Sequence, residues 1–192
     1  ILITLAGKSK RFKEAGYLRP KFLLEIDEKP ILLHVTEMFS KDDTFHFVFN
    51  KEHVSQYPEI LDIIKINIRN YYIYKIEPND EGPVYSALKA TEISDNTPFI
   101  LAYCDFFVEW DYNLFKNSVH GYDMAIPSFK GFHPASYGKT KYAYTKVDNK
   151  NELIGLKEKE SYTENRVEEF ANSGIYYFKN WKTFEINSNK LI

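Results

Sequence analysis

Several basic side chains follow the first apolar run of the chain. Residues 1–5 (ILITL) are mostly apolar, and residues 6–21 are mostly polar, with Gly7 near their start. The cationic residues of this segment are Lys8, Lys10, Arg11, Lys13, Arg19 and Lys21. A glycine lets backbone N–H groups approach a phosphate closely, and basic side chains add charge-assisted hydrogen bonds. The segment therefore predicts a cradle for a triphosphate, held by Arg11 and Lys21, although a solvated surface loop would have the same composition.

A single carboxylate stands at the end of the most apolar run in the chain. Residues 99–103 read FILAY, and Cys104 and Asp105 follow them. A carboxylate at the tip of a buried strand is costly unless it is paired or binds a cation. Mg²⁺ in proteins takes one or two carboxylates together with phosphate oxygens. We therefore expect Asp105 to be a magnesium ligand, the alternative being an aspartate that caps the next turn.

Other reactive residue types give weaker indications. Glu109 and Asp111 are expected at the start of a helix, and the five histidines show no metal-ligand spacing. Cys104 has no identifiable base partner and is expected to be a small buried apolar residue. Lys159 lies in a run of alternating charges, where it could face an anion or simply belong to an exposed edge strand. The motifs GxSxG, GxGxxG and GxxxxGK[ST] are absent, which argues against a hydrolase, a Rossmann dehydrogenase and a P-loop enzyme.

The elements that must position these residues change in character along the chain. Strands are predicted over residues 1–5, 22–26, 45–49, 71–76 and 99–103. Helices are predicted over residues 30–39 and 84–93, and Val54, Tyr57, Leu61 and Ile64 share one helical face. This alternation is typical of an α/β domain with a mixed, mostly parallel sheet flanked by helices. The second half offers strands over residues 124–127, 142–147, 153–157 and 175–178 with little helix between them, which indicates antiparallel strands or hairpins added to the same sheet.

Ligands of open α/β sheets bind at the carboxyl ends of the strands. Four polar clusters occupy such positions here: residues 6–21, 78–82, 104–105 and 158–161. Their convergence at one edge of the sheet is stronger support for a site than any one cluster.

The composition excludes some classes of partner. The formal net charge is −2 and the isoelectric point is about 6.3, so nothing attracts a nucleic acid nonspecifically. Apolar stretches are too short to span a bilayer, and no signal peptide is visible, so no membrane partner is expected. The one cysteine cannot form an internal disulfide, which fits a cytoplasmic location. Both ends look trimmed from a longer protein.

At this point the residues resemble the sugar-phosphate nucleotidyltransferases, whose signature is written AGxGxR…PKxLxxxxxxP. The residues that match its close relatives are Ala6, Gly7, Arg11, Phe12, Ala15, Gly16, Tyr17, Pro20, Lys21, Leu24 and Pro30. The segments EGPVYSALKA, FILAYCDFF, YAYTKVDNKNELIGLKEKES and ANSGIYYFKN resemble later motifs of the family, in the same order. The resemblance covers about residues 1–180.

The resemblance implies a Rossmann-like fold in one nucleotidyltransferase domain, residues 1–192, with a nucleotide half (1–105) and a sugar-phosphate half (106–192). It implies catalysis by Arg11, Lys21 and Asp105, with Mg²⁺ on Asp105. The nucleotide-binding residues it implies are Leu5, Ala6, Gly7, Lys8, Ser9, Lys10, Arg11, Lys21, Asn79 and Gly82. The residues implied for sugar-phosphate binding are Tyr142, Glu158, Lys159, Asn172 and Gly174.

The activity that the resemblance implies is transfer of a nucleotide from a nucleoside triphosphate to a sugar-1-phosphate or similar phosphate monoester, with release of pyrophosphate. Synthesis of bacterial capsule or lipopolysaccharide is the role expected by default. Relatives often form dimers or tetramers, so a homo-oligomer is compatible with the family. The base and the acceptor stay open, including non-sugar acceptors such as phosphocholine, for which the rings of Phe132, Tyr137 and Tyr144 could line a pocket.

Three departures from the family pattern leave alternatives open. Ser9 replaces the second loop glycine, Ala143 replaces a glycine in the sugar hairpin, and a second metal-binding aspartate of many relatives would fall beyond Ile192. A glycosyltransferase of the related GT-A type would need a D-x-D motif, where Asp105, Phe106 and Phe107 stand. A non-catalytic nucleotide-binding domain of the same fold is the other alternative.

Overall fold

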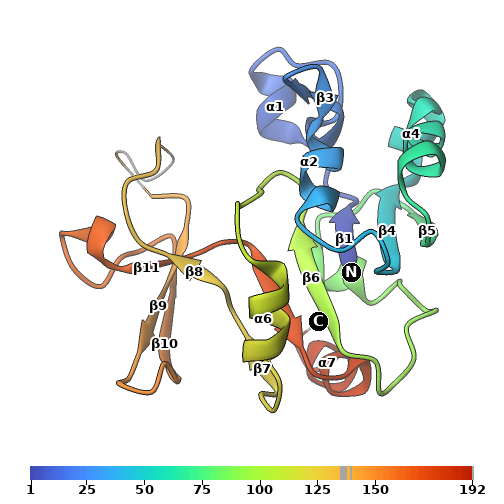
Figure 1. Ribbon diagram of the computed structural model, residues 1–192. Coiled ribbons are helices and arrows are strands. Elements are labelled where there is room, and N and C mark those ends of the chain that lie inside the picture. The colour runs from blue at the N-terminus through green and yellow to red at the C-terminus, as the bar shows by residue number, and fades with distance from the viewer. Residues whose placement is uncertain (135–137, 139, 192) are drawn as a thin grey trace. The chain divides into compact units, whose positions relative to one another are not determined.

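The computed structural model describes residues 1–134, 138 and 140–191, and it divides into two compact units. The first unit comprises Ile1–Ala125 and Tyr176–Ile192, and the second comprises Ile126–Ile175. The second unit is therefore an insertion in the sequence of the first (Figure 1).

The first unit is built on a six-stranded sheet in the order β5-β4-β1-β6-β12-β7. The strands are β1 (Leu2–Leu5), β4 (Phe45–Asn50), β5 (Tyr71–Ile76), β6 (Phe99–Tyr103), β7 (Met124–Ala125) and β12 (Ile175–Phe178). The pairs β1–β4, β1–β6 and β4–β5 are parallel, whereas β7 and β12 are antiparallel. Every residue of β4 is buried, as expected for a central strand with both faces covered. The predicted α/β class with a mostly parallel sheet is confirmed.

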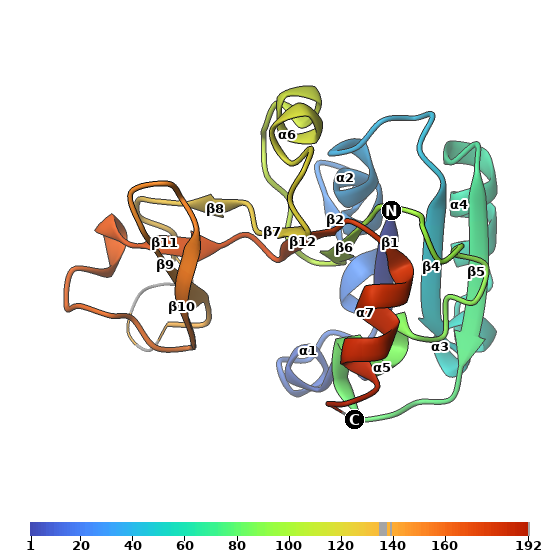
Figure 2. The same ribbon diagram turned by 90° about the horizontal axis from the view of Figure 1, so that it is seen from below.

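Helices cover both faces of this sheet. The helices of this unit are α1 (Lys10–Glu14), α2 (Ile31–Glu37), α3 (Lys51–Gln56), α4 (Glu59–Asn67), α5 (Gly82–Ala87), α6 (Tyr112–Ser118) and α7 (Trp181–Ser188). Helices α5 and α7 pack side by side on one core with β1 and β6 (Figure 2). In that core the ring of Phe99 lies 5.2 Å from the rings of Trp181 and Phe184, and each such ring pair adds about 0.5–1.5 kcal/mol to area burial.

The opposite face carries a second set of rings, contributed by alternate residues of β4. Phe49 contacts Phe22, at 5.6 Å between ring centroids, and Phe45 contacts Phe39 at 6.3 Å. Because side chains of a strand alternate between faces, these residues point away from Val48, which packs with α5 and α7. Both faces of the sheet are thus closed by apolar packing, and its polar groups gather at the strand ends.

Some predicted elements differ from the structure. The expected strand over residues 22–26 is a 3-10 turn, η1 (Lys21–Leu23), followed by the short antiparallel pair β2 (Glu25–Ile26) and β3 (Lys29–Pro30). The helical face from Val54 to Ile64 belongs to two helices, because Pro58 caps the start of α4 and ends the preceding run. Helix α1 lies inside the expected loop, α5 ends at Ala87 rather than near residue 93, and α7 was not predicted.

The second unit is a four-stranded antiparallel sheet in the order β10-β9-β11-β8. The antiparallel strands predicted for the second half are confirmed, but their predicted addition to the same sheet is wrong for these four, because only β7 and β12, of the strands described in this half, join the first sheet. Its strands are β8 (Ser128–Phe129), β9 (Ala143–Val147), β10 (Leu153–Glu158) and β11 (Phe170–Asn172), with a 3-10 turn, η3 (Arg166–Glu168). Strand β10 is an edge strand on which Leu153, Ile154 and Leu156 are each at least half exposed. Among the described residues of the whole chain, no helix is both long and apolar enough to cross a membrane.

Candidate active site

The loop that leaves β1 is fixed at its start by burial. Leu5 and Ala6 are 1% and 2% exposed, and Gly7 is the first exposed residue. Ser9 then takes a left-handed conformation (φ 52°, ψ 32°) at the N-terminal end of α1. This conformation is easy for glycine and uncommon for serine, so the loop keeps a glycine-like backbone although the family glycine is replaced.

The side chain of Ser9 gains nothing from this position. It does not cap α1, and within the described part of the chain its buried Oγ has no hydrogen-bond partner. A buried hydroxyl without a partner costs stability. Ser9 is therefore tolerated by the fold of the loop rather than required by it.

Two lysines of the loop bind one carboxylate that the sequence analysis did not name. The Lys8 ammonium lies 2.6 Å from Oδ2 of Asp80, and the Lys10 ammonium lies 3.3 Å from Oδ1. Hydrogen bonds from Lys8 and Lys10 lower the pKa of Asp80. The cluster at residues 78–82 was predicted to converge on the loop, and its position after β5 was the signal that could have identified Asp80.

Lys21 and Asp105, which the sequence placed in two separate polar clusters at strand ends, form an ion pair. The Lys21 ammonium donates a hydrogen bond of 2.7 Å to Oδ2 of Asp105, and the two side chains are 24% and 31% exposed. Burial alone would lower the pKa of Lys21, but the neighbouring Cys104 and Asp105, with this hydrogen bond, raise it overall. Lys21 is therefore a fixed cation beside the end of β6.

Cys104 is buried beneath this ion pair. Burial raises the pKa of its thiol to about 11, so the thiol is neutral near pH 7 and is a poor nucleophile there. The expectation that Cys104 is a small buried residue agrees with its 3% exposure.

Arg11 lies close enough to Lys21 to oppose the rise in the pKa of Lys21. It forms no ion pair with any residue that the structure describes. Four of the six cations of this segment, Lys8, Lys10, Arg11 and Lys21, therefore lie near the two carboxylates of Asp80 and Asp105. This positive excess favours an anion.

Asn79 and Gly82 shape the turn before α5. The Asn79 side chain accepts a hydrogen bond from the N–H of Glu81 (3.1 Å) and donates one to the carbonyl of Glu77 (3.2 Å). Gly82 has φ +91°, a conformation that other residues rarely adopt. Both residues hold the turn that carries Asp80, and their predicted contacts with a nucleotide stay predictions.

The candidates for sugar-phosphate binding lie in the second unit, at one end of its sheet. Glu158 pairs with Ala143, and the N–H of Lys159 donates to the carbonyl of Tyr142 at 2.9 Å. The charged ends of Glu158 and Lys159 lie 3.4 Å apart, and both side chains are about two-thirds exposed. Ala143 lies in an ordinary strand, so the alanine that replaces the family glycine meets no backbone obstacle.

The remaining candidates lie in β11 and the turn after it. Because β11 pairs with β9 through Ala171 and Tyr144, Asn172 lies toward the Ala143 end of β9. The buried side chain of Asn172 accepts a hydrogen bond from the N–H of Gly174 (2.8 Å), and Gly174 has φ +73°. The second unit therefore gathers all five sugar-phosphate candidates at one sheet end.

The aromatic residues considered for a pocket have different surroundings. Tyr144 is 1% exposed and belongs to the core, which contradicts its placement in an open pocket, whereas Phe132 is 69% exposed. Tyr137 lies outside the described residues. Tyr142 forms a hydrogen bond of 2.7 Å with Nδ1 of His133, and burial raises the pKa of Tyr142 to about 12, so its hydroxyl stays protonated.

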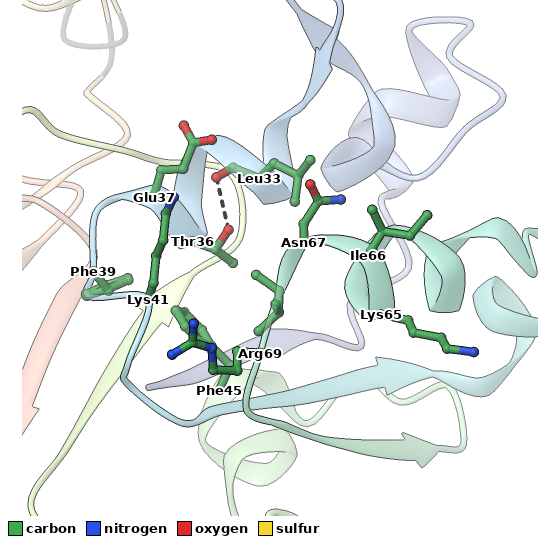
Figure 3. A pocket seen from close by; sticks show the side chains of 11 residues that line it. Leu33, Thr36, Glu37, Phe39, Lys41, Phe45, Lys65, Ile66, Asn67 and Arg69 are labelled. Carbon is green, nitrogen blue, oxygen red and sulfur yellow. Dashed lines mark hydrogen bonds between the residues drawn. The ribbon is translucent and has the colours of Figure 1, made fainter.

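A cavity of about 390 Å³ lies elsewhere in the first unit, next to Phe45 at the amino end of β4 (Figure 3). Its lining comes mainly from α2, α4 and the segments after them, and the Thr36 hydroxyl there donates to the carbonyl of Leu33 at 3.0 Å. None of the predicted site residues lines it. We place the candidate site at the carboxyl ends of the strands instead, because the charged groups gather there.

Comparison with known proteins gives one family and several relatives. The sequence model described as "MobA-like NTP transferase domain" matches residues 1–154. The chain is 28% identical over 187 residues to "Bifunctional protein GlmU" of Methanocaldococcus jannaschii, covering 96% of this chain and 41% of that protein. It is 26% identical over 184 residues to "Mannose-1-phosphate guanylyltransferase catalytic subunit beta" of Dictyostelium discoideum, covering 92% and 48%. The chain thus spans less than half the length of these two curated relatives.

Solved structures share the fold at low sequence identity. A nucleoside-diphosphate-sugar pyrophosphorylase from Vibrio cholerae superposes with a TM-score of 0.77 and 17% identity, covering 100% of this chain and 78% of that one. HddC from Yersinia pseudotuberculosis gives a TM-score of 0.70 and 22% identity, covering 96% and 78%.

Proposed function

The chain belongs to the MobA-like NTP transferase domain family, and from this premise we propose that it transfers a nucleotide from a nucleoside triphosphate to a sugar-1-phosphate or similar phosphate monoester. Pyrophosphate is the second product. The observation that carries the proposal is the pairing of Lys8 and Lys10 with Asp80, and of Lys21 with Asp105 beside Arg11, at the strand ends of one sheet.

These residues suit phosphoryl chemistry, in which a protein mainly positions groups and stabilises charge. A phosphate oxygen of the acceptor attacks the α-phosphorus in line, and the bond from that phosphorus to the oxygen of the β-phosphate breaks. The acceptor is already an anion, so no general base is required. Arg11 and Lys21 offset the charge that develops on the departing pyrophosphate.

Asp105 is the residue that would hold Mg²⁺. No group of three or more His, Cys, Asp or Glu residues suited to a metal occurs among residues 1–134, 138 and 140–191. A magnesium ion needs only one or two protein carboxylates when phosphates supply the other ligands, so one carboxylate fits. Bound there, the ion would reduce the negative charge of the α-phosphate toward the attacking anion.

The hairpin of the second unit supplies groups for the acceptor. Lys159 is a two-thirds exposed cation suited to a phosphate, and Glu158 can accept hydrogen bonds from sugar hydroxyls. We assign Tyr142, Asn172 and Gly174 to the same acceptor site on the family resemblance. Cytoplasmic synthesis of bacterial capsule or lipopolysaccharide precursors is the role we propose on that resemblance alone.

The test is release of pyrophosphate by the chain with Mg²⁺, with CTP, UTP, GTP, ATP and dTTP screened against sugar-1-phosphates and other small phosphate monoesters. We expect release with a preferred pair, and loss of at least about 99% of it in Asp105→Ala, the scale of removing a key electrostatic contact. The matched control is Asp95→Ala, which removes an exposed aspartate paired with Lys182 at 3.1 Å. Wild-type turnover in Asp105→Ala would remove the metal role, and nucleotide binding without release from any pair would favour a non-catalytic domain.

A further inference from the structure

One carboxylate, that of Asp80, pairs with two cations of the polar segment after β1, residues 6–21, which we call the nucleotide loop. Asp80 uses a different oxygen for each lysine, Oδ2 for Lys8 and Oδ1 for Lys10. These contacts join segments that are 72 residues apart in the sequence, the loop after β1 and the turn after β5. Asp80 therefore presents to Lys8 and Lys10 the same kind of acceptor, two anionic oxygens, that a polyphosphate would present.

The turn beneath Asp80 holds it in this position. Asn79 bonds to the backbone at Glu77 and Glu81, and Gly82 provides the positive φ at which α5 begins. The hydrogen bonds from Lys8 and Lys10 also lower the pKa of Asp80, which keeps its carboxylate charged at neutral pH. The contact is thus supported by the geometry of the turn as well as by charge.

The contact is nevertheless weak enough to exchange. The side chains of Asp80 and Lys10 are 63% and 65% exposed, and that of Lys8 is 33% exposed. Exposed ion pairs contribute little because water screens them, whereas a polyphosphate has several charges and many acceptor oxygens. A polyphosphate that binds the loop should displace Asp80 from Lys8 and Lys10. The two ion pairs of Asp80 should form again when the polyphosphate dissociates.

We propose that Asp80 is an affinity-setting residue, a carboxylate that competes with polyphosphate for Lys8 and Lys10. The proposal rests on the proposed nucleotide site. In that site, Asp80 weakens the binding of the triphosphate and, after transfer, of pyrophosphate. Asp80 thereby favours the release of pyrophosphate, because it pairs again with Lys8 and Lys10 when pyrophosphate dissociates.

The test is the affinity of the chain for pyrophosphate and for inorganic tripolyphosphate, measured by calorimetry without metal. Asp80→Asn keeps the shape of the side chain and removes its charge, and we expect both anions to bind about fivefold more tightly, as expected for two exposed ion pairs. The matched control is Asp95→Asn, which removes the same charge from another exposed ion pair, that with Lys182. It should leave both affinities within about twofold of the wild type, since distant exposed charges are screened.

A second comparison identifies the lysines as the cause. In a Lys8→Gln, Lys10→Gln background, Asp80→Asn should change neither affinity, because the groups for which it competes are gone. Unchanged or weaker binding in Asp80→Asn alone, or an equal gain in Asp95→Asn, would overturn the proposal. Because these titrations need no turnover, a gain in Asp80→Asn without any pyrophosphate release would contradict the proposed function alone. Turnover without that gain would contradict only the role of Asp80.

Discussion

The two charged regions of the molecule are assembled in different ways. In the first unit, Lys21 and Asp105 are 84 residues apart in the sequence, and the end of β6 supplies one of them. In the second unit, Glu158 and Lys159 are neighbours in the sequence. The first pair is about three-quarters buried on its lysine side, and the second is about two-thirds exposed.

The two regions therefore differ in preorganisation, that is, in how far their side chains are already ordered before a ligand binds. Groups held by a sheet and by each other lose little freedom when they bind, whereas exposed side chains must be ordered at that moment. We therefore expect the nucleotide loop of the first unit to be rigid, and the hairpin of the second unit to adapt to its own ligand. Substitutions in the two regions should differ in what they change and by how much.

The largest effect should come from Lys21. Lys21→Ala removes a charge-assisted contact and leaves Asp105 without its partner, so we expect triphosphate binding to weaken by about 1.5–3 kcal/mol. Titration calorimetry measures this, with Lys182→Ala as the control, because Lys182 also pairs with an aspartate but lies on α7. An affinity equal to that of the wild type would remove Lys21 from the site.

A substitution in the hairpin of the second unit should change the kinetics of the acceptor alone. Lys159→Ala should raise the KM for the phosphorylated acceptor by about tenfold, the scale of one charge-assisted contact, without altering triphosphate affinity. The melting temperature should hardly change, because the pair with Glu158 is exposed. Steady-state kinetics test this against Lys150→Ala, at the opposite end of the same hairpin, and equal KM changes in both variants would count against a specific phosphate contact.

The smallest effect concerns the backbone of the loop. Ser9→Gly relieves a left-handed conformation and removes a buried hydroxyl without a described partner, and glycine adds flexibility to the unfolded chain. We expect the free energy of unfolding to rise by about 1 kcal/mol, measured in urea. The reverse change, Gly16→Ser at φ +89°, should lower it, and a loss of stability in Ser9→Gly would show that the serine is required.

The sequence predicted best what depends on continuous local patterns. The apolar runs predicted β4 as a strand and β6 as a central strand, and the strand-end rule placed the two clusters that contain Lys21 and Asp105 at one edge of the sheet. The contact of Asp80 with Lys8 was missed because it joins two loops, and the strand-end rule indicated the cluster of residues 78–82 without identifying the residue in it that makes the contact. The short helix α7 was missed because its buried residues, Trp181 and Phe184, are buried by contacts with Phe99, which is distant in the sequence. The roles of the nucleotide and sugar-phosphate residues stay predictions.

The position of the second unit in the chain has a consequence for evolution. The chain leaves the main sheet after Ala125 in β7 and returns through β12, where Tyr177 lies directly opposite Ala125. The two points of attachment are therefore neighbours across one pair of strands. A segment attached in this way can be lengthened, shortened or exchanged by recombination while the parallel strands and the nucleotide loop keep their register. The junction between β7 and β12 is thus a natural crossover point, at which descendants of one ancestor can acquire different inserted segments.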